Sequence, residues 1–473
     1  MPPFLPVLAL AVGASAPALD CTLYPSPLPE LRVRGECRAV GWPAEPAWEL
    51  GMRAGDAFVG DAFVTDRLAQ PRGAQWVVSW RVDAGAMADA HRDVDVALRA
   101  GDAVIVNDCN LLLRPAEVPP DTRITVRVAG EVLLSAPWLP GGAPRTYTLS
   151  AAALEGGSYL VFGPQRALDV KVPGAPVSAV AVGRPGRAGD AALTTWVSRS
   201  AGMSARFGGG SLPVARTLVV VVPWAEQSDP GVFGSTLRWG LGSAVLFYGA
   251  EAPAESFAAD WVAPHELFHL HNPDVVHRVP WFTEGFTTYY QDVLRARGGV
   301  RPPPVAWKGL LDGFRHGCAT DQRTPLRAAS ADMRRNHDYR RVYWGGACTA
   351  FILDVALREH TDNRESLDTV YRALAAESRG PGGALDEAGV VERLRNALPA
   401  DHWGRAWLHA SLDGRAALPV GELASRLGVS VSGEQARFDD GAPWSHVRRA
   451  ILEEPVPSPA PARRPATPPP PPR

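Results

Sequence analysis

His265 and His269 stand four residues apart in the run HELFH, a spacing that requires a helix if both side chains serve one site. Positions i and i+4 of a helix share a face, so both imidazoles can reach a single metal ion. Glu266, beside the first histidine, is then directed at a metal-bound water and can take its proton. The HExxH pattern therefore predicts a catalytic zinc site with His265 and His269 as ligands and Glu266 as general base.

A catalytic zinc ion needs a third protein ligand and an open fourth position. Glu284 follows His269 by fifteen residues, inside the helical pattern Pro280–Arg297, which contains the run WFTEGFTTYY. A short loop joins this pattern to the first helix, so the Glu284 carboxylate can face the two histidines. The alternative is a surface glutamate on an amphipathic helix. The spacing favours Glu284 as the third ligand of one Zn²⁺ per chain.

The pair of motifs HELFH and WFTEGFTTYY resembles the gluzincin zinc metallopeptidases, and most closely the glycyl aminopeptidase family. The alanyl aminopeptidase and leukotriene A4 hydrolase group is a more distant relative. In these families the glutamate of the second motif is the third zinc ligand, which maps onto Glu284. They also carry a tyrosine in a short motif ending in Gly-Ala, and Val342–Ala347 (VYWGGA) occupies that place. The resemblance implies that the Tyr343 hydroxyl stabilises the reaction's oxyanion; the alternative is a buried aromatic at a helix start.

The resemblance implies a zinc-dependent peptidase that hydrolyses peptide bonds by Glu266-assisted attack of a zinc-bound water. One alternative is a gluzincin that hydrolyses something other than a peptide, and another is a non-catalytic, zinc-stabilised binding protein. The intact Glu266 argues against the binding protein, because a structural zinc site needs no base beside it. The expected partner is a peptide or protein substrate, and the sequence defines neither its preferred sequence nor the oligomeric state.

The chain departs from the family pattern around the zinc motif. The stretch between His269 and Glu284 is shorter than usual, so the connecting loop must be tight. Pro264 directly precedes His265, and a proline inside a helix removes a backbone hydrogen bond. We therefore expect the helix to start near Asp260, a possible N-cap.

A further departure concerns the substrate amine, which aminopeptidase relatives hold with a glutamate on a glycine-rich edge strand. In Trp239–Ala244 (WGLGSA) Gly242 occupies the place of that glutamate, and Glu251 and Glu255 are not in register with it. The sequence thus predicts weakened aminopeptidase action, with internal or N-blocked peptides tolerated. The competing interpretation is that Glu251 or Glu255 folds into the site, so exo- versus endopeptidase action stays open.

Three other histidines lie near these motifs. His271 and His277 are predicted to be loop or outer residues rather than a fourth ligand, because three ligands are already supplied. His337 is predicted to be an exposed loop residue rather than an auxiliary electrophile.

The 473 residues are enough for several domains, and the pattern predicts an α+β multidomain chain. Residues 19–205 carry short alternating runs between Gly and Pro clusters and predict a β-sandwich-like domain. Residues 206–300 hold the buried strand patterns TLVVVV and AVLFY and the zinc motifs, and predict a thermolysin-like catalytic region. Residues 301–454 predict a helical C-terminal part, and 455–473 a disordered Pro-rich tail.

A net charge of −2 and 21% charged residues give no basis for electrostatic capture of nucleic acid or an acidic membrane. Residues 1–18 hold a short apolar stretch followed by small residues, which outlines a signal peptide cleaved after Ala18. An uncleaved apolar N-terminus is the alternative. No later run approaches the roughly 20 apolar residues of a membrane span. We expect export to the periplasm or the extracellular space.

The five cysteines contain no CxxC pair, so a cysteine zinc site is not expected. In an oxidising compartment Cys21–Cys37 and Cys318–Cys348 are the natural pairs, which leaves Cys109 single. Five buried free thiols are the alternative, and the sequence does not decide between them.

Overall fold

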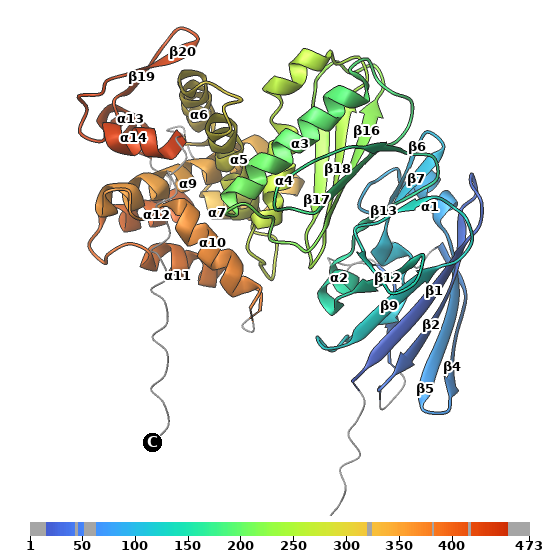
Figure 1. Ribbon diagram of the computed structural model, residues 1–473. Coiled ribbons are helices and arrows are strands. Elements are labelled where there is room, and N and C mark those ends of the chain that lie inside the picture. Colours follow the sequence, from blue (N-terminus) through green and yellow to red (C-terminus); the bar gives the residue numbers. More distant parts are fainter. Residues whose placement is uncertain are drawn as a thin grey trace, which may run out of the picture. The chain divides into compact units, whose positions relative to one another are not determined.

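The computed structural model describes residues 16–42, 46–51, 63–318, 324–380, 383–414 and 418–452. The chain forms two compact units that divide between Asn272 and Pro273 (Figure 1). This division falls inside residues 206–300. That these residues form one catalytic domain therefore stays a prediction. Most of the predicted signal peptide and the whole Pro-rich tail lie outside the described residues.

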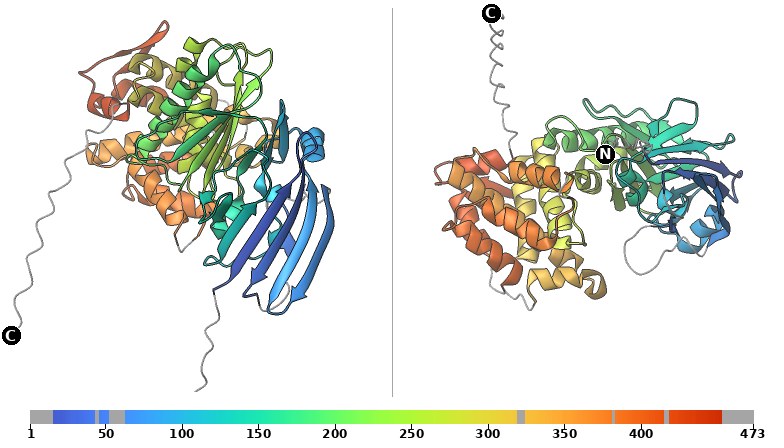
Figure 2. Two further views of the ribbon diagram at one scale, coloured as in Figure 1. Left: turned by 45° about the vertical axis from the view of Figure 1, so that its right-hand side comes forward. Right: turned by 90° about the horizontal axis from the view of Figure 1, so that it is seen from below.

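The first unit begins with a seven-stranded sheet of order β11-β12-β9-β1-β2-β5-β4. Its long strands lie side by side, in blue, in Figure 2 (left). Strand β2 shows why the segment forms a sheet, since charged and small or apolar residues alternate between its exposed and buried faces. The strands are β1 (Ala18–Pro25), β2 (Arg32–Val40), β4 (Val64–Arg72), β5 (Gln75–Asp83), β9 (Arg123–Val128), β11 (Leu139–Pro140) and β12 (Thr146–Leu149).

A four-stranded antiparallel sheet of order β10-β13-β7-β6 forms the next layer. Strands β7 and β13 are buried on both faces. One face of the pair packs on the seven-stranded sheet, and the opposite face packs on the sheet that follows in the chain. Its strands are β6 (Ala97–Ala100), β7 (Ala103–Asn107), β10 (Leu134–Ser135) and β13 (Tyr159–Phe162). The other elements of this part of the chain are β3 (Trp48–Glu49), α1 (Ala84–His91), η2 (Asp108–Asn110), β8 (Arg114–Pro115) and α2 (Ala151–Gly156).

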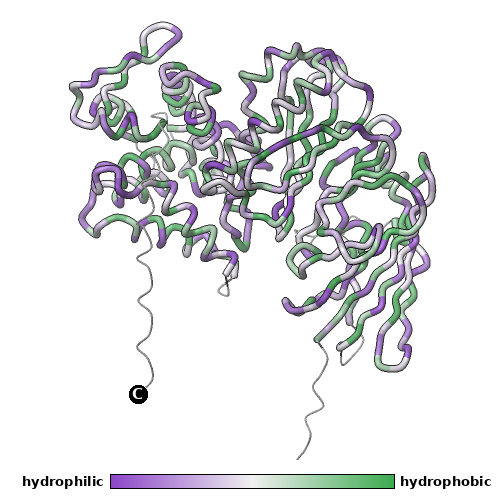
Figure 3. Tube along the Cα trace, in the orientation of Figure 1, coloured by the Kyte–Doolittle hydropathy of each residue, from purple (hydrophilic) through white to green (hydrophobic). Residues whose placement is uncertain are grey.

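The third sheet carries the zinc motif and has the order β14-β15-β16-β18-β17. Strands β15, β16 and β18 run parallel, and the two edge strands are antiparallel to their neighbours. The predicted buried strands are confirmed in β16 and β18, where Figure 3 shows hydrophobic residues concentrated. The strands are β14 (Arg166–Leu168), β15 (Val177–Ala181), β16 (Thr217–Trp224), β17 (Phe233–Leu237) and β18 (Gly242–Gly249).

Helices α3 (Gly189–Phe207) and α4 (Val262–Phe268) cover one face of this sheet (Figure 1). Their apolar side chains share a core with the inward residues of β16 and β18. Two short 3₁₀ turns, η3 (Ala254–Ala259) and η4 (His269–His271), flank α4 in the chain. The opposite face of the sheet packs on β7 and β13, so the first unit is a stack of sheets capped by helices.

The placement of Gly242 on an edge strand is wrong. The edge strand on this side of the sheet is β17, and Gly242 is the first residue of the inner strand β18. A Cβ at Gly242 would lie 2.9 Å from Thr217 Oγ1 and 3.0 Å from the Leu270 side chain, so the position is closely packed. The expectation failed because glycines occur on both sides of the turn at 238–241, and sequence alone does not show which strand ends the sheet.

The second unit is helical in its described part, with one β-hairpin, and Figure 2 (right) shows its helices packed side by side in yellow to red. The predicted helix at Pro280–Arg297 is confirmed as α5. The other elements are α6 (Pro303–Gly317), α7 (Leu326–Ala331), α8 (Met333–Asn336), α9 (Tyr339–Thr361), α10 (Leu367–Ser378), α11 (Glu387–Asn396), α12 (Trp403–Asp413), α13 (Val420–Arg426), β19 (Val429–Ser432), β20 (Gln435–Phe438) and α14 (Ser445–Leu452).

Helix α5 is anchored to α9 and α10 by buried polar pairs. Tyr289 donates to Asp354 on α9 at 2.8 Å, and Tyr290 donates to Asp368 on α10 at 2.8 Å. Arg297 forms an ion pair with the same Asp368 at 2.7 Å. Because these groups are buried, losing one partner would leave another polar group unsatisfied, which holds α5 in place.

Both predicted disulfides are confirmed. Cys21–Cys37 joins β1 to β2, and Cys318–Cys348 joins the residue after α6 to α9. Cys109 is a buried free thiol, so the alternative of five free thiols is wrong. Among the described residues no helix combines the length and apolarity needed to cross a membrane. The described part is a mixed α+β chain with a helical C-terminal portion, as the sequence predicted.

Candidate active site

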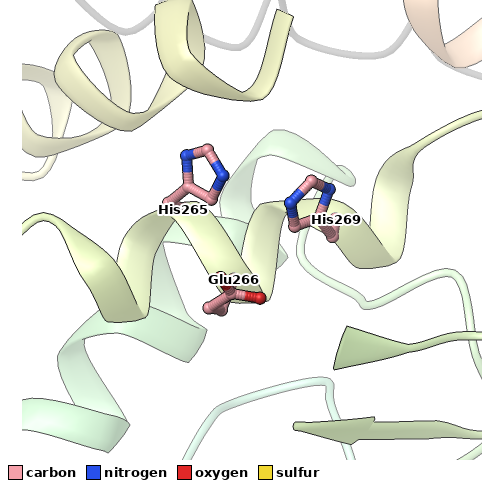
Figure 4. A group of neighbouring side chains, drawn as sticks. All are labelled: His265, Glu266 and His269. Carbon is pink, nitrogen blue, oxygen red and sulfur yellow. The ribbon is translucent and has the colours of Figure 1, made fainter. Parts of the chain in front are cut away.

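His265, Glu266 and His269 form a cluster whose potential ligand atoms all lie within 4.8 Å of one another. Figure 4 shows the two imidazoles on the upper side of the helix and Glu266 on its lower side, between the two histidines along the helix axis. The imidazole centroids are 4.8 Å apart, and His265 is only 3% exposed. Two neighbouring imidazoles and a nearby carboxylate fit the donor chemistry of a zinc site with a base beside it.

The start of α4 explains how a proline can precede the first histidine. The Asp260 carboxylate accepts hydrogen bonds from the backbone N–H of Val262 at 3.0 Å and of Ala263 at 2.9 Å. It also accepts one from the Trp196 indole at 2.8 Å, which ties the cap to α3. Pro264 therefore falls in the first turn, where a backbone N–H has no partner within the helix.

Asn272 orients the second histidine. Its side-chain amide lies 2.9 Å from His269 Nδ1, and the residue is 1% exposed. The contacting atom is the amide nitrogen Nδ2, and the contact with Nδ1 restricts the rotation of the His269 ring. Asn272 was not predicted as a site residue from the sequence. The available signal was a polar side chain three positions after the histidine, on the same face of a helical turn.

A polar cluster lies against the face of the edge strand β17 that carries Ser235. Tyr159 donates to Asp95 Oδ1 at 2.9 Å and lies 2.7 Å from Ser235 Oγ on β17. Burial raises the pKa of Tyr159, and the Asp95 and Glu266 charges raise it further, so the phenol stays protonated. Asp95 thus places a carboxylate beside an edge strand that carries none itself. No local sequence signal marks it.

Glu284 and Tyr343 belong to the second unit, on α5 and α9. These helices cross closely, because a Cβ on Gly285 would overlap Gly346 and a Cβ on Gly346 would overlap the Trp281 carbonyl. Glu284 adjoins Gly285, and Tyr343 lies one turn before Gly346. The crossing therefore brings together the two helix segments that carry them, and their roles beside the histidine cluster stay predictions.

The other histidines and glutamates singled out from the sequence differ in their burial. His271 is buried, and its Nε2 lies 2.8 Å from the Ser204 carbonyl of α3, so it takes part in packing. His277 and His337 are exposed. Glu251 and Glu255, the alternative amine ligands, are exposed beyond the end of β18.

Sequence comparison finds no family model and no curated protein that matches this chain. Solved structures are similar in fold. An aminopeptidase N family protein from Idiomarina loihiensis is 17% identical with a TM-score of 0.67, over 88% of this chain and 79% of that one. A two-domain M1 zinc metallopeptidase bound to L-tryptophan is 15% identical with a TM-score of 0.51, over 85% and 95%.

Native yeast leukotriene A4 hydrolase is 11% identical with a TM-score of 0.50, over 87% of this chain and 70% of that one. At these identities the likeness establishes the fold alone, and the resemblance to the glycyl aminopeptidase family stays a prediction. The chain therefore shares the fold of the M1, aminopeptidase N-like zinc metallopeptidases, and it brings the HExxH side chains together on α4 and at His269, the C-cap of that helix.

Proposed function

We propose that this chain is a zinc metallopeptidase in which His265, His269 and Glu284 hold one Zn²⁺ and Glu266 is the general base. The observation that carries the proposal is the cluster of HExxH side chains within 4.8 Å, in a chain with an M1-type fold. The spacing of Glu284 and its resemblance to the family motif support it as third ligand. Two imidazoles and one carboxylate are an established ligand set for catalytic zinc.

The chain's own residues divide the chemistry. When bound, zinc polarises the scissile carbonyl and activates a water molecule for attack. Glu266 takes a proton from that water and later delivers it to the leaving amine. The Tyr343 hydroxyl donates a hydrogen bond to the carbonyl oxygen as negative charge develops there. Asn272 contacts His269 Nδ1 and restricts the rotation of that ring.

Export to an oxidising compartment is part of the proposal. The two disulfides are compatible with it, because such bonds persist mainly outside the cytosol. A non-peptidase gluzincin and a zinc-stabilised binding protein are the alternatives. Testing peptides as substrates distinguishes a peptidase from a non-peptidase gluzincin. Loss of activity on substitution of Glu266 distinguishes an enzyme from a zinc-stabilised binding protein.

Metal analysis together with a peptide library tests this function, and we expect about one zinc per chain and measurable cleavage. Each peptide is supplied with a free and with an acetylated N-terminus. We expect acetylated peptides to be cleaved, because Phe233–Leu237 contains no carboxylate to offset the desolvation of an ammonium group.

Cleavage limited to single residues from free N-termini would contradict the expected tolerance and show an aminopeptidase. Asp95, beside the edge strand, would then be the first carboxylate to substitute. Protein that holds no zinc and cleaves no peptide would overturn the proposed function itself.

Replacing Tyr343 with phenylalanine tests the oxyanion role. We expect Tyr343→Phe to lower kcat by about 100-fold with little change in KM, since the hydroxyl acts on charge that develops only in the transition state. The matched control is Tyr339→Phe, because Tyr339 lies on the same helix and is 42% exposed. An unchanged kcat in Tyr343→Phe would assign this residue to packing.

A further inference from the structure

The edge strand β17 holds the side chain of Glu266. Thr236 Oγ1 lies 3.0 Å from Glu266 Oε2 and also 3.0 Å from the backbone carbonyl oxygen of Glu266. A hydroxyl has one hydrogen, so it donates to one of these acceptors at a time. Thr236 and Glu266 are 30 residues apart in the chain, so the contact joins the edge strand directly to the zinc-motif helix.

Gly234 provides the space for this contact. A Cβ at Gly234 would overlap Glu266 Cγ and would lie 3.1 Å from Glu266 Oε1. Residues two apart on a strand point to the same face, so Gly234 and Thr236 both face the glutamate. On the face of β17 that contacts Glu266, Gly234 therefore leaves room for the glutamate and Thr236 offers it a hydroxyl group.

We propose that Thr236 is a positioning residue for the general base, with Gly234 as the small residue that lets the carboxylate lie against the strand. The inference rests on the proposed function. A base must lie within hydrogen-bond reach of the proton that it removes, and a glutamate side chain has many rotamers to restrict. A hydrogen bond to a charged carboxylate is among the stronger ones in proteins, so one hydroxyl suffices to select an orientation.

The competing explanation is packing, because threonine is a good strand former whatever its hydroxyl touches. Two substitutions separate the explanations. Thr236→Val keeps the β-branched shape and removes the hydroxyl, whereas Thr236→Ser keeps the hydroxyl and removes a methyl group. If the hydroxyl is what matters, valine impairs the enzyme and serine does not.

The experiment measures kcat, KM, bound zinc and the unfolding temperature, using the library peptide that the wild-type chain cleaves best. We expect Thr236→Val to lower kcat by about 10-fold with KM, zinc content and unfolding temperature nearly unchanged. Thr236→Ser should retain most of the wild-type kcat. In the Glu266→Gln background, Thr236→Val should have no further effect on residual turnover, because the group that it positions is already lost. Thr65→Val, at an exposed threonine of β4, is the control.

An unchanged kcat in Thr236→Val would overturn the inference, as would equal losses in the valine and serine variants. A further loss of residual turnover in the Glu266→Gln background would also overturn it, since it would show an effect independent of the base. If the wild-type chain cleaves no peptide, the proposed function fails and the inference fails with it. If the wild-type chain and Thr236→Val cleave the peptide at equal rates, the inference about Thr236 is wrong and the proposed function stands.

Discussion

Glu266→Gln is expected to keep its zinc and its fold while losing peptide hydrolysis by several orders of magnitude. Proton transfer by a positioned side chain typically contributes about 10²–10⁴-fold, and activation of the attacking water is coupled to it. Glutamine preserves the size of the side chain and its ability to bond Thr236, but it cannot accept a proton at neutral pH. The measurement is kcat/KM on the best library peptide, alongside metal analysis and thermal unfolding.

The control for this variant is Glu131→Gln, at an exposed glutamate of the same unit. It should leave activity unchanged. Retained hydrolysis in Glu266→Gln, with zinc bound, would show that another group takes the proton. Loss of zinc from Glu266→Gln would instead show that Glu266 binds the metal, a different assignment within the same cluster.

Glu284→Gln is expected to weaken zinc binding, because an anionic ligand is replaced by a neutral amide. Loss of an outer-shell partner typically costs 10–100-fold in metal affinity, so loss of a direct ligand should cost on the order of 100-fold or more. The change is nearly isosteric and should leave the close crossing of α5 and α9 at Gly285 and Gly346 intact. Competition against a chromophoric chelator measures the affinity, and metal analysis after dialysis measures retention.

Glu434→Gln, at an exposed turn of the second unit, is the control for that measurement. If Glu284→Gln binds zinc as tightly as the wild-type chain, the assignment of the third ligand falls. Glu266→Gln and Glu284→Gln fail in different ways, since one should lose turnover with zinc present and the other should lose zinc first. Together they separate the base from the ligand without reference to any relative.

Local sequence spacing determined much of the candidate site. His265, Glu266 and His269 lie within five consecutive residues, so the helix alone brings them together once it forms. The Asp260 cap and the tolerance of Pro264 follow from rules that act within one turn. The helix at Pro280–Arg297, the strands in β16 and β18, and the two disulfides between segments 16 and 30 residues apart were likewise within reach.

The tertiary structure alone decided which strand ends the sheet and what touches the base. Gly242 was placed on the edge strand from sequence, yet β17 occupies the edge and puts Gly234 and Thr236 against Glu266. Ser235 meets Asp95 across 140 residues of chain, a contact that no periodicity encodes. Helical periodicity reports which residues share a face of one element, whereas contacts between distant segments depend on how whole elements pair and pack. For that reason the metal-binding helix can be predicted from the sequence, while the residues that orient its general base cannot.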